Sequence, residues 1–171
     1  QALKEMKKAE TDLKKTMHRL RIRQDNKIKG FVINKGRLQP PVHGHLVSRF
    51  GETENKGPIS NHTKNGITIK VKDGEPVRAV FDGKVIFVGY KRGYGNMVVI
   101  DHGLHYLSVT ARLEKINVKE GQTVAKGDII GRAGDIATLF ANGLYFEIRH
   151  KTKPLDPLKW FKGKNFSDGN L

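Results

Sequence analysis

Residues 74–103 read GEPVRAVFDGKVIFVGYKRGYGNMVVIDHG, and this stretch decides the fold class. Runs of valine, isoleucine and phenylalanine alternate in it with turns that contain glycine. β-Branched and aromatic side chains favour extended strands, and glycine adopts the backbone angles that tight turns need. The same alternation continues on both sides, so the sequence predicts strands at residues 67–71, 77–81, 85–88, 97–100, 106–110, 128–130 and 144–148.

This strand pattern predicts a mainly β fold, an antiparallel sandwich or a barrel-like domain. The strongest turn signal is Asp82-Gly83, which predicts a hairpin between residues 77–81 and 85–88. A type I′ turn requires positive φ at both central residues, and Asp-Gly tolerates this well. Beyond the last strand, Trp160-Phe161 is expected to pack an aromatic anchor on the core.

Residues 1–26 are expected to form a helical arm, because they contain no glycine or proline and are rich in Lys, Glu, Leu, Met and Ala. Residues 27–40 are predicted to be a linker, since glycine and proline interrupt them. Residues 41–163 form the predicted domain, and residues 164–171 a flexible tail. The arm carries a seam with the spacing of a coiled coil, made of Leu3, Met6, Glu10, Leu13, Met17 and Leu20.

The chain carries 32 Lys and Arg against 17 Asp and Glu, a formal net charge of +15. This charge favours an anionic partner, but no nucleic-acid-binding motif accompanies it, and a basic helix is equally a solvated coiled-coil face. The absence of cysteine excludes disulfides and thiolate metal sites. The sequence has neither a membrane-spanning apolar run nor a signal-peptide pattern. Because it begins with Gln1, we expect a fragment that lacks its targeting segment.

Several motifs occur in an order that resembles the LytM domains of the M23 peptidase family, over roughly residues 36–161. In active members, two histidines and one aspartate hold a zinc ion, and the enzyme hydrolyses peptide cross-links of peptidoglycan. The motifs are GRLQPPVHGHLVSRFG at 36–51, NGITI at 65–69, GEPVRAVFDGKV at 74–85, GYGNMVVIDHG at 93–103, VKEGQTVAKGDIIG at 118–131 and LYFEIR at 144–149.

The resemblance places unsuitable residues at every position that serves the metal. Lys64 stands for the first histidine ligand and Thr68 for the aspartate, while Gly143 and Tyr145 occupy the two histidine positions of the later motif. Arg112 replaces the histidine that assists catalysis. A lysine ammonium has no lone pair at neutral pH, and a neutral hydroxyl is a poor substitute for a carboxylate. We therefore expect no catalytic residues, no metal and no cofactor.

A LytM domain without metal ligands, preceded by a helix, resembles the EnvC-type murein hydrolase activators. This resemblance implies a non-catalytic activator that binds a cell-wall amidase through the former substrate groove at division, in the periplasm or cell envelope. A membrane division complex would bind the coiled coil, peptidoglycan is a further candidate partner, and nucleic acid is not expected. The expected partner-binding residues are Asn65, Thr68, Tyr94, Met97, Thr110, Arg112, Tyr145 and Arg149.

Tyr145 and Arg149 are the preferred pair, because residues four apart on one strand face the same side. They would present an aromatic anchor beside a fork that binds carboxylates. The alternative is an edge tyrosine with an arginine paired to Glu147 or Asp101. A second hypothesis places the seam of the arm in the groove, as a restraint that blocks the partner.

Other functions remain as alternatives. A zinc endopeptidase with shifted ligands would use histidines outside the family positions, among which His43, His45, His102 and His105 are expected to be surface or turn residues. His62 is the one histidine placed to compensate for Lys64. A lipoyl-like carrier would modify Lys84 at a hairpin tip, although the usual residues around such a lysine are missing.

Overall fold

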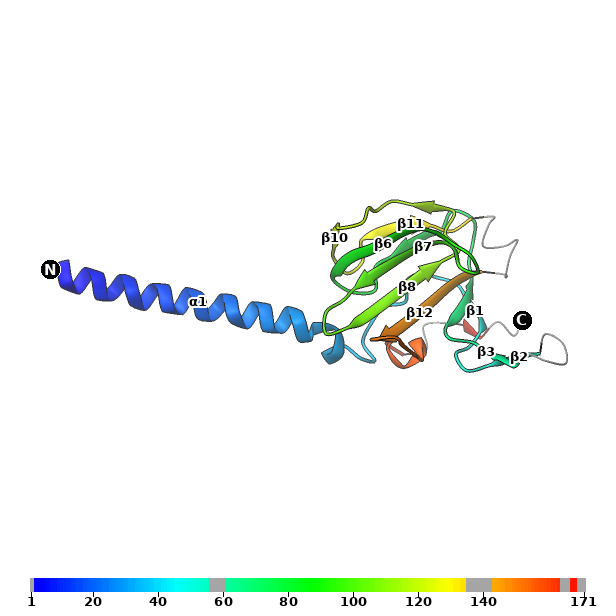
Figure 1. Cartoon of the computed structure of the whole chain (residues 1–171), viewed down its shortest axis with the longest axis horizontal. Coiled ribbons are helices and arrows are strands. Elements are labelled where there is room, and N and C mark those ends of the chain that lie inside the picture. Colours follow the sequence, from blue (N-terminus) through cyan, green and yellow to red (C-terminus); the bar gives the residue numbers. More distant parts are fainter. Residues whose placement is uncertain (1, 56–60, 135–142, 164–166, 169–171) are drawn as a thin grey trace.

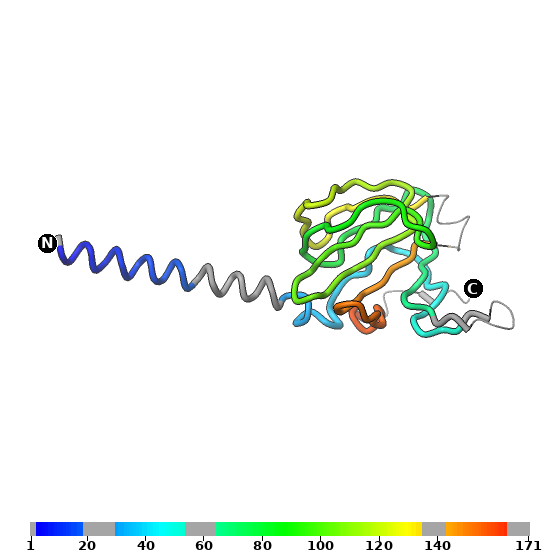
Figure 2. The backbone as a smooth tube through the Cα atoms, in the orientation of Figure 1, coloured from blue at the N-terminus to red at the C-terminus, as the bar shows by residue number. Residues whose placement is uncertain are grey.

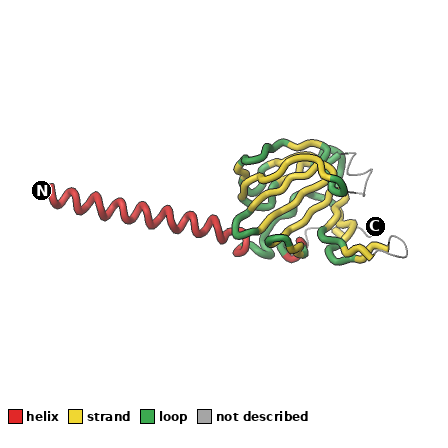
Figure 3. Tube along the Cα trace, in the orientation of Figure 1, coloured by secondary structure: helices red, strands yellow, loops and turns green. Residues whose placement is uncertain are grey.

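The computed structural model describes residues 2–55, 61–134, 143–163 and 167–168. One long helix, α1 (Ala2–Ile33), projects from a domain built of strands, and it meets that domain only at its C-terminal end (Figures 1 and 3). The described part of its seam faces solvent, since Leu3, Met6, Leu13 and Met17 are all exposed. The seam therefore does not lie over the domain, which contradicts the restraint hypothesis for this structure.

The helix runs beyond residue 26 and includes residues 27–33, which the sequence assigned to the linker. Phe31 explains the difference, because its ring is 0% exposed and stacks between Trp160 and His102, 4.7 Å from each. Burial of this ring stabilises the last turn more than the glycine at position 30 weakens it. Gly30 itself allows close approach, since a Cβ there would lie 3.0 Å from the Phe81 ring.

In the described parts of the chain, the strands form three sheets. Figure 2 shows the path of the backbone through them. The large sheet has the order β10-β6-β7-β8-β12-β4-β1-β14, with β13 paired to β12. Its strands are β1 (His45–Ser48), β4 (Ile67–Lys70), β6 (Gly83–Lys91), β7 (Gly95–Asp101), β8 (Tyr106–Ala111), β10 (Thr123–Val124), β12 (Leu144–His150), β13 (Lys153–Leu155) and β14 (Ser167–Asp168). The other two sheets are β5 (Pro76–Arg78), β11 (Ile129–Arg132) and β9 (Lys115–Ile116), and β2 (Thr53–Asn55) with β3 (Asn61–Thr63).

The main core lies between the large sheet and the three-stranded sheet. Inward-facing residues of both sheets pack together there, and the end of α1 and the segment around the short helix η1 (Pro157–Lys159) close it. Trp160 and Phe161 are buried in this core, as the sequence predicted. Leu38 of the predicted linker is also buried and forms a bridge with Phe161. The linker is therefore part of the packed structure.

The opposite face of the large sheet, here called the outer face, carries a second and smaller apolar cluster. Met97, Val99, Val109 and Ala111 are its buried members, and partly buried hydrophobic residues pack around them. Along β12 the residues Leu144, Phe146 and Ile148 point into the main core, so Tyr145, Glu147 and Arg149 lie on the outer face. This face positions the candidate site.

The mainly β fold is confirmed, and each predicted strand overlaps an observed one, although the strand predicted at 77–81 ends at Arg78. The Asp82-Gly83 hairpin is wrong. The strand before this pair, β5, joins the small sheet, whereas β6 joins the large one. Gly83 is needed for a different reason, because a Cβ there would collide with the Asp101 carbonyl. In the tail predicted to be flexible, Ser167–Asp168 forms β14, which pairs with β1 and satisfies part of its edge.

Candidate functional site

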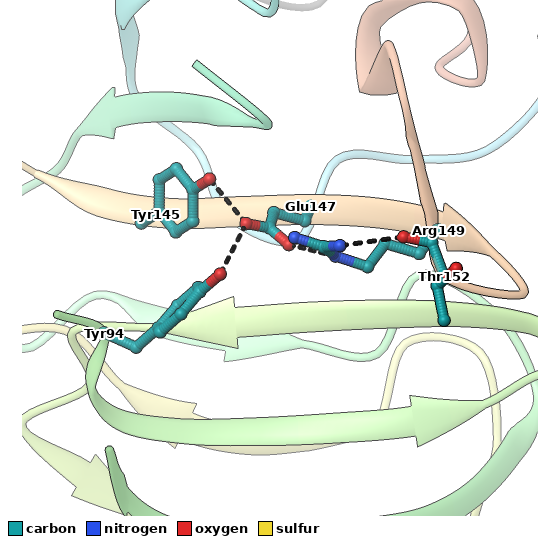
Figure 4. A network of polar contacts seen from close by, with 5 residues as sticks. All are labelled: Tyr94, Tyr145, Glu147, Arg149 and Thr152. Atoms are coloured by element: carbon teal, nitrogen blue, oxygen red, sulfur yellow. Dashed lines mark hydrogen bonds and ion pairs between the residues drawn. The ribbon is translucent and has the colours of Figure 1, made fainter. Parts of the chain in front are cut away.

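The buried carboxylate of Glu147 organises the candidate site (Figure 4). Tyr145 Oη donates to Glu147 Oε2 at 2.6 Å, and Tyr94 Oη donates to the same oxygen at 3.3 Å. Arg149 Nε donates to Glu147 Oε1 at 2.6 Å and forms an ion pair with it. Arg149 Nη1 also donates to the Thr152 carbonyl at 3.0 Å. Strand alternation produces this arrangement, because residues 145, 147 and 149 share the outer face.

The surroundings of Glu147 explain why it needs these partners. Its side chain is 1% exposed, and a buried carboxylate is tolerated only when it is paired and hydrogen-bonded. Burial, together with the hydrogen bond to Glu147, raises the pKa of Tyr145, and burial with the nearby negative charge raises that of Tyr94. The hydrogen bond to Glu147 raises the pKa of Arg149. Both phenols therefore remain protonated donors, and the arginine remains a cation.

Arg112 and Thr68 complete the surroundings of Tyr145. The Arg112 guanidinium carbon lies 5.0 Å from the centre of the Tyr145 ring, in a cation–π contact, and the Arg112 amide donates to the Tyr94 carbonyl at 3.1 Å. Thr68 is the cross-strand partner of Tyr145 on β4, so the two side chains lie on the same face. The rings of Tyr94 and Tyr145 are 5.9 Å apart.

Most of the predicted partner-binding residues meet around Tyr145, with one clear exception. Tyr94, Arg112, Tyr145 and Arg149 lie on the outer face with Met97, which is largely covered by its neighbours. Asn65 is exposed just before β4. Thr110 pairs with Phe146 and lies on the core side, 2% exposed, so a partner does not reach it.

The guanidinium group of Arg149 is not free to bind a partner carboxylate with two hydrogen bonds, as the sequence analysis expected. The structure shows the alternative arrangement, in which it pairs with Glu147.

The residues that the resemblance assigns to the metal positions do not fit zinc. Lys64 and Arg112 contribute positive charge, Thr68 a neutral hydroxyl, and the Tyr145 hydroxyl already donates to Glu147. A side chain at Gly143 would collide with the Ile69 carbonyl. Within the described parts of the chain, no group of three or more His, Cys, Asp or Glu residues is placed to hold a metal ion.

The histidines outside the family positions lie apart from this site. His43, His45 and His105 are exposed, whereas His102 is buried and has a hydrogen-bond partner at each ring nitrogen. His102 Nδ1 is 2.8 Å from the Asp82 carbonyl oxygen, its Nε2 is 2.7 Å from Ser108 Oγ, and burial lowers its pKa to about 4. The side chain of His62 lies outside the described residues.

Sequence reasoning did not identify Glu147 as the centre of the site. It considered Glu147 only as the alternative partner of Arg149. The available signal was the period-two pattern of β12, which puts a carboxylate between a tyrosine and an arginine on one face. Because a buried carboxylate is costly without hydrogen-bond donors, this pattern itself pointed to a network.

Comparison with known proteins identifies relatives of the chain. The family model described as Peptidase family M23 matches residues 62–157. Murein hydrolase activator NlpD of Escherichia coli (strain K12) is 35% identical over 121 residues, which cover 70% of this chain and 30% of that protein. The lipoprotein NlpD/LppB homolog of Pseudomonas aeruginosa is 38% identical over 122 residues, which cover 70% of this chain and 38% of that protein.

A solved structure of a zinc-containing peptidase from Vibrio cholerae has the same fold, with a TM-score of 0.64 and 31% identity, over 75% of this chain and 41% of that chain. The present chain spans about a third of the length of the curated relatives it matches. In the described residues, no helix has the length and apolar character needed to cross a membrane.

Proposed function

Because the chain belongs to peptidase family M23 and the residues that the resemblance assigns to the metal positions do not fit zinc, we propose that it is a non-catalytic activator of peptidoglycan amidases. It binds its amidase through the outer face around Tyr145 and relieves inhibition of that enzyme during cell-wall remodelling at division. The observation that carries the proposal is the network of Tyr94, Tyr145 and Arg149 on the buried Glu147. Tyr145 stands where the resemblance would put a histidine of the metal site.

The network suits recognition because it fixes large side chains before a partner arrives. Tyrosine and arginine are frequent energetic anchors of protein interfaces, and anchors held in place lose less conformational entropy on binding. Arg149 is 23% exposed, and two of its three guanidinium nitrogens are engaged, so a partner carboxylate would meet the third. Arg112, in cation–π contact with Tyr145, adds positive charge nearby. The site therefore favours a partner segment with acidic side chains.

The names of the relatives support the place of action. Two of them are called a murein hydrolase activator and a lipoprotein, and this agrees with a role in the cell envelope. The exposed seam of α1 supports an additional helical partner, which we propose to be part of a membrane division complex. Peptidoglycan is a second candidate ligand for this basic chain.

The proposal is tested with purified chain, purified amidases from the same organism and dye-labelled peptidoglycan. Dye release is expected only when an amidase and the chain are both present, and Tyr145→Ala and Arg149→Ala should weaken amidase binding about tenfold or more. Arg78→Ala, which removes an exposed arginine of β5, is the matched control and should bind normally. Chelator-sensitive dye release by the chain alone would favour a peptidase with shifted ligands instead.

A further inference from the structure

The C-terminal end of α1 is held on the domain by one buried side chain. Phe31 is the only described residue of α1 in the main core cluster. Its ring contacts four rings of the domain, at centroid distances of 4.7–6.0 Å, and we call these rings the Phe31 socket: Phe81, His102, Tyr106 and Trp160. Because the rest of α1 projects away from the domain (Figure 1), the socket fixes the direction of the arm.

The turn that follows α1 has the properties of a hinge. Residues 34–37 form this turn, and Gly36 has a φ of 82°, which glycine adopts without steric cost. The chain is fixed again at Leu38, whose amide donates to the Trp160 carbonyl at 3.0 Å and whose carbonyl accepts from the Lys162 amide at 2.8 Å. Loss of Phe31 from its socket would therefore free α1 at the turn and leave the attachment of Leu38 intact.

His102 is the residue of the socket whose charge can change. Its Nδ1 lies 2.8 Å from the Asp82 carbonyl oxygen, and because a carbonyl only accepts, Nδ1 carries the hydrogen. Nε2 then accepts from Ser108 Oγ at 2.7 Å. Proton uptake at Nε2 would turn this acceptor into a donor and force the buried Ser108 hydroxyl to point its hydrogen elsewhere. The neutral ring is therefore the form that fits the closed socket.

Burial dominates the electrostatics of His102. It lowers the pKa of His102 to about 4, although the hydrogen bond to Asp82 and the carboxylates of Asp101 and Asp82 act in the opposite direction. α1 and β8 contact the ring through uncharged side chains. Two basic groups lie one ring further away: Lys35 Nζ is 5.4 Å from the centre of the tryptophan ring of the socket, and His150 stacks on the tyrosine ring at 4.3 Å.

We propose that the joint between α1 and the domain responds to acid: protonation of His102 releases Phe31 from its socket and frees α1 at residues 34–37, while the β-domain stays folded. Phe31 covers one face of the imidazole, with ring planes 8° apart, so its departure opens that face to water. A hydrated imidazolium is stable, whereas a buried one is costly. The domain keeps its core, because Phe31 is the one described residue of α1 in it.

The direction of the response follows from the two pKa values. The closed socket holds the pKa of His102 at about 4, below its ordinary 6.5, so the released state binds the proton more tightly. Docking is at full strength above pH 6.5 and weakens as the pH falls towards 4. Over this range the ratio of released to docked chain should rise by up to about 300-fold. This inference concerns the arm and does not rest on the proposed function.

Distances between two spin labels on the full chain test the release. Because the chain has no cysteine, Met17→Cys on α1 and Tyr90→Cys on β6, both more than half exposed, label the arm and the domain. Their distance distribution should be narrow at pH 7 and about twofold broader or more at pH 4. The pair Tyr90→Cys and Lys153→Cys lies within the domain and should stay narrow. A narrow arm distance at pH 4, or equal broadening of both pairs, would overturn the proposal.

Substitutions assign the response to one residue. His102→Gln should remove the pH dependence of the broadening, whereas the matched control His150→Gln should retain it. The reverse result would assign the response to His150 and overturn the proposal. Phe31→Ala should give a broad arm distance already at pH 7, and a narrow distance in this variant would mean that another contact holds the helix.

Nitrogen-15 NMR of the histidine rings gives a test that needs no substitution at His102, and it stays decisive where His102→Gln disturbs folding. At pH 7 the ring of His102 should carry its proton on Nδ1 and none on Nε2. The midpoint of its titration should coincide with the midpoint of the arm broadening. Titration of His102 at a clearly different pH would separate the two events and contradict the proposed joint.

Discussion

The Tyr145 hydroxyl lies 2.6 Å from the buried carboxylate of Glu147, although the resemblance to M23 peptidases predicts a metal-binding histidine at position 145. The Tyr145 side chain donates a hydrogen bond to a negative charge, so its hydroxyl is occupied by the carboxylate. Position 145 therefore supplies a hydrogen-bond donor where the resemblance would put a metal ligand, and the same carboxylate also binds Tyr94 and Arg149.

Removing one hydrogen-bond donor from this network should lower the free energy of unfolding, and the shorter the lost bond to Glu147, the larger the loss should be. Tyr145→Phe keeps the ring and removes a 2.6 Å bond, so it should cost about 1.5–3 kcal/mol of unfolding free energy. Tyr94→Phe removes a 3.3 Å bond and should cost less, about 0.5–1 kcal/mol. Urea unfolding checks both values. Equal stability of Tyr145→Phe and the unchanged chain would show that the bond to Glu147 does not contribute.

Acid should destabilise the fold through His102. Burial lowers the folded-state pKa of His102 to about 4 from its ordinary 6.5, so the unfolded chain binds a proton more readily. The associated stability is fully present above pH 6.5 and is lost as the pH falls towards 4, to a total of about 3 kcal/mol. Urea unfolding between pH 7 and 4 measures this loss. His102→Gln should reduce the slope in this range, and an unchanged slope would assign the loss to other groups.

The packing of the C-terminal end of α1 on the domain should depend on the aromatic ring of Phe31. Phe31→Ala removes a fully buried ring that stacks on His102 and Trp160 and should cost about 3–5 kcal/mol. Val32→Ala, at a 39% exposed neighbouring position, is the matched control and should cost less than about 1 kcal/mol. Thermal unfolding distinguishes the two. A small effect of Phe31→Ala would mean that the helix end is not part of the folded domain.

Introducing the family's metal ligands should create a zinc site if the resemblance matches the positions correctly. The triple variant Lys64→His, Thr68→Asp and Tyr145→His places two histidines and one aspartate at these positions, and it should bind about one zinc ion with Kd in the micromolar range or below. The unchanged chain should bind no zinc at this site. Metal analysis after gel filtration and calorimetric titration measure both. Stoichiometric zinc in the unchanged chain would contradict the proposed loss of the site.

Local patterns in the sequence located the strands, but they did not determine which strands pair. The alternation of apolar and polar residues predicted the positions of β4, β6, β7, β8 and β12. This works because the residue pattern within a strand depends on which of its own side chains are buried. Asp82-Gly83 failed as a hairpin signal because pairing depends on distant residues, and β5 and β6 join different sheets. The same nonlocal effect lengthened α1, since the partners of Phe31 lie at positions 102 and 160.

Part of the candidate site could also be predicted from the local pattern of one strand. Tyr145 and Arg149 were expected on one face of a strand, and the structure places them there. Thr110 was misassigned although period two was available to exclude it, because it shares its face with the buried Ser108. The contribution of Tyr94 to the network required the structure, since this residue approaches Glu147 from a loop 53 positions away.

The short strand β14 has a consequence for self-association. It lies parallel to β1 and occupies hydrogen-bonding groups on the outer edge of the large sheet. An unoccupied edge of this kind invites strands of other molecules, and this is a common start of aggregation. Ser167–Asp168 thus protect that edge from pairing with another molecule. A variant truncated before Ser167 would be prone to self-associate through the exposed edge of β1.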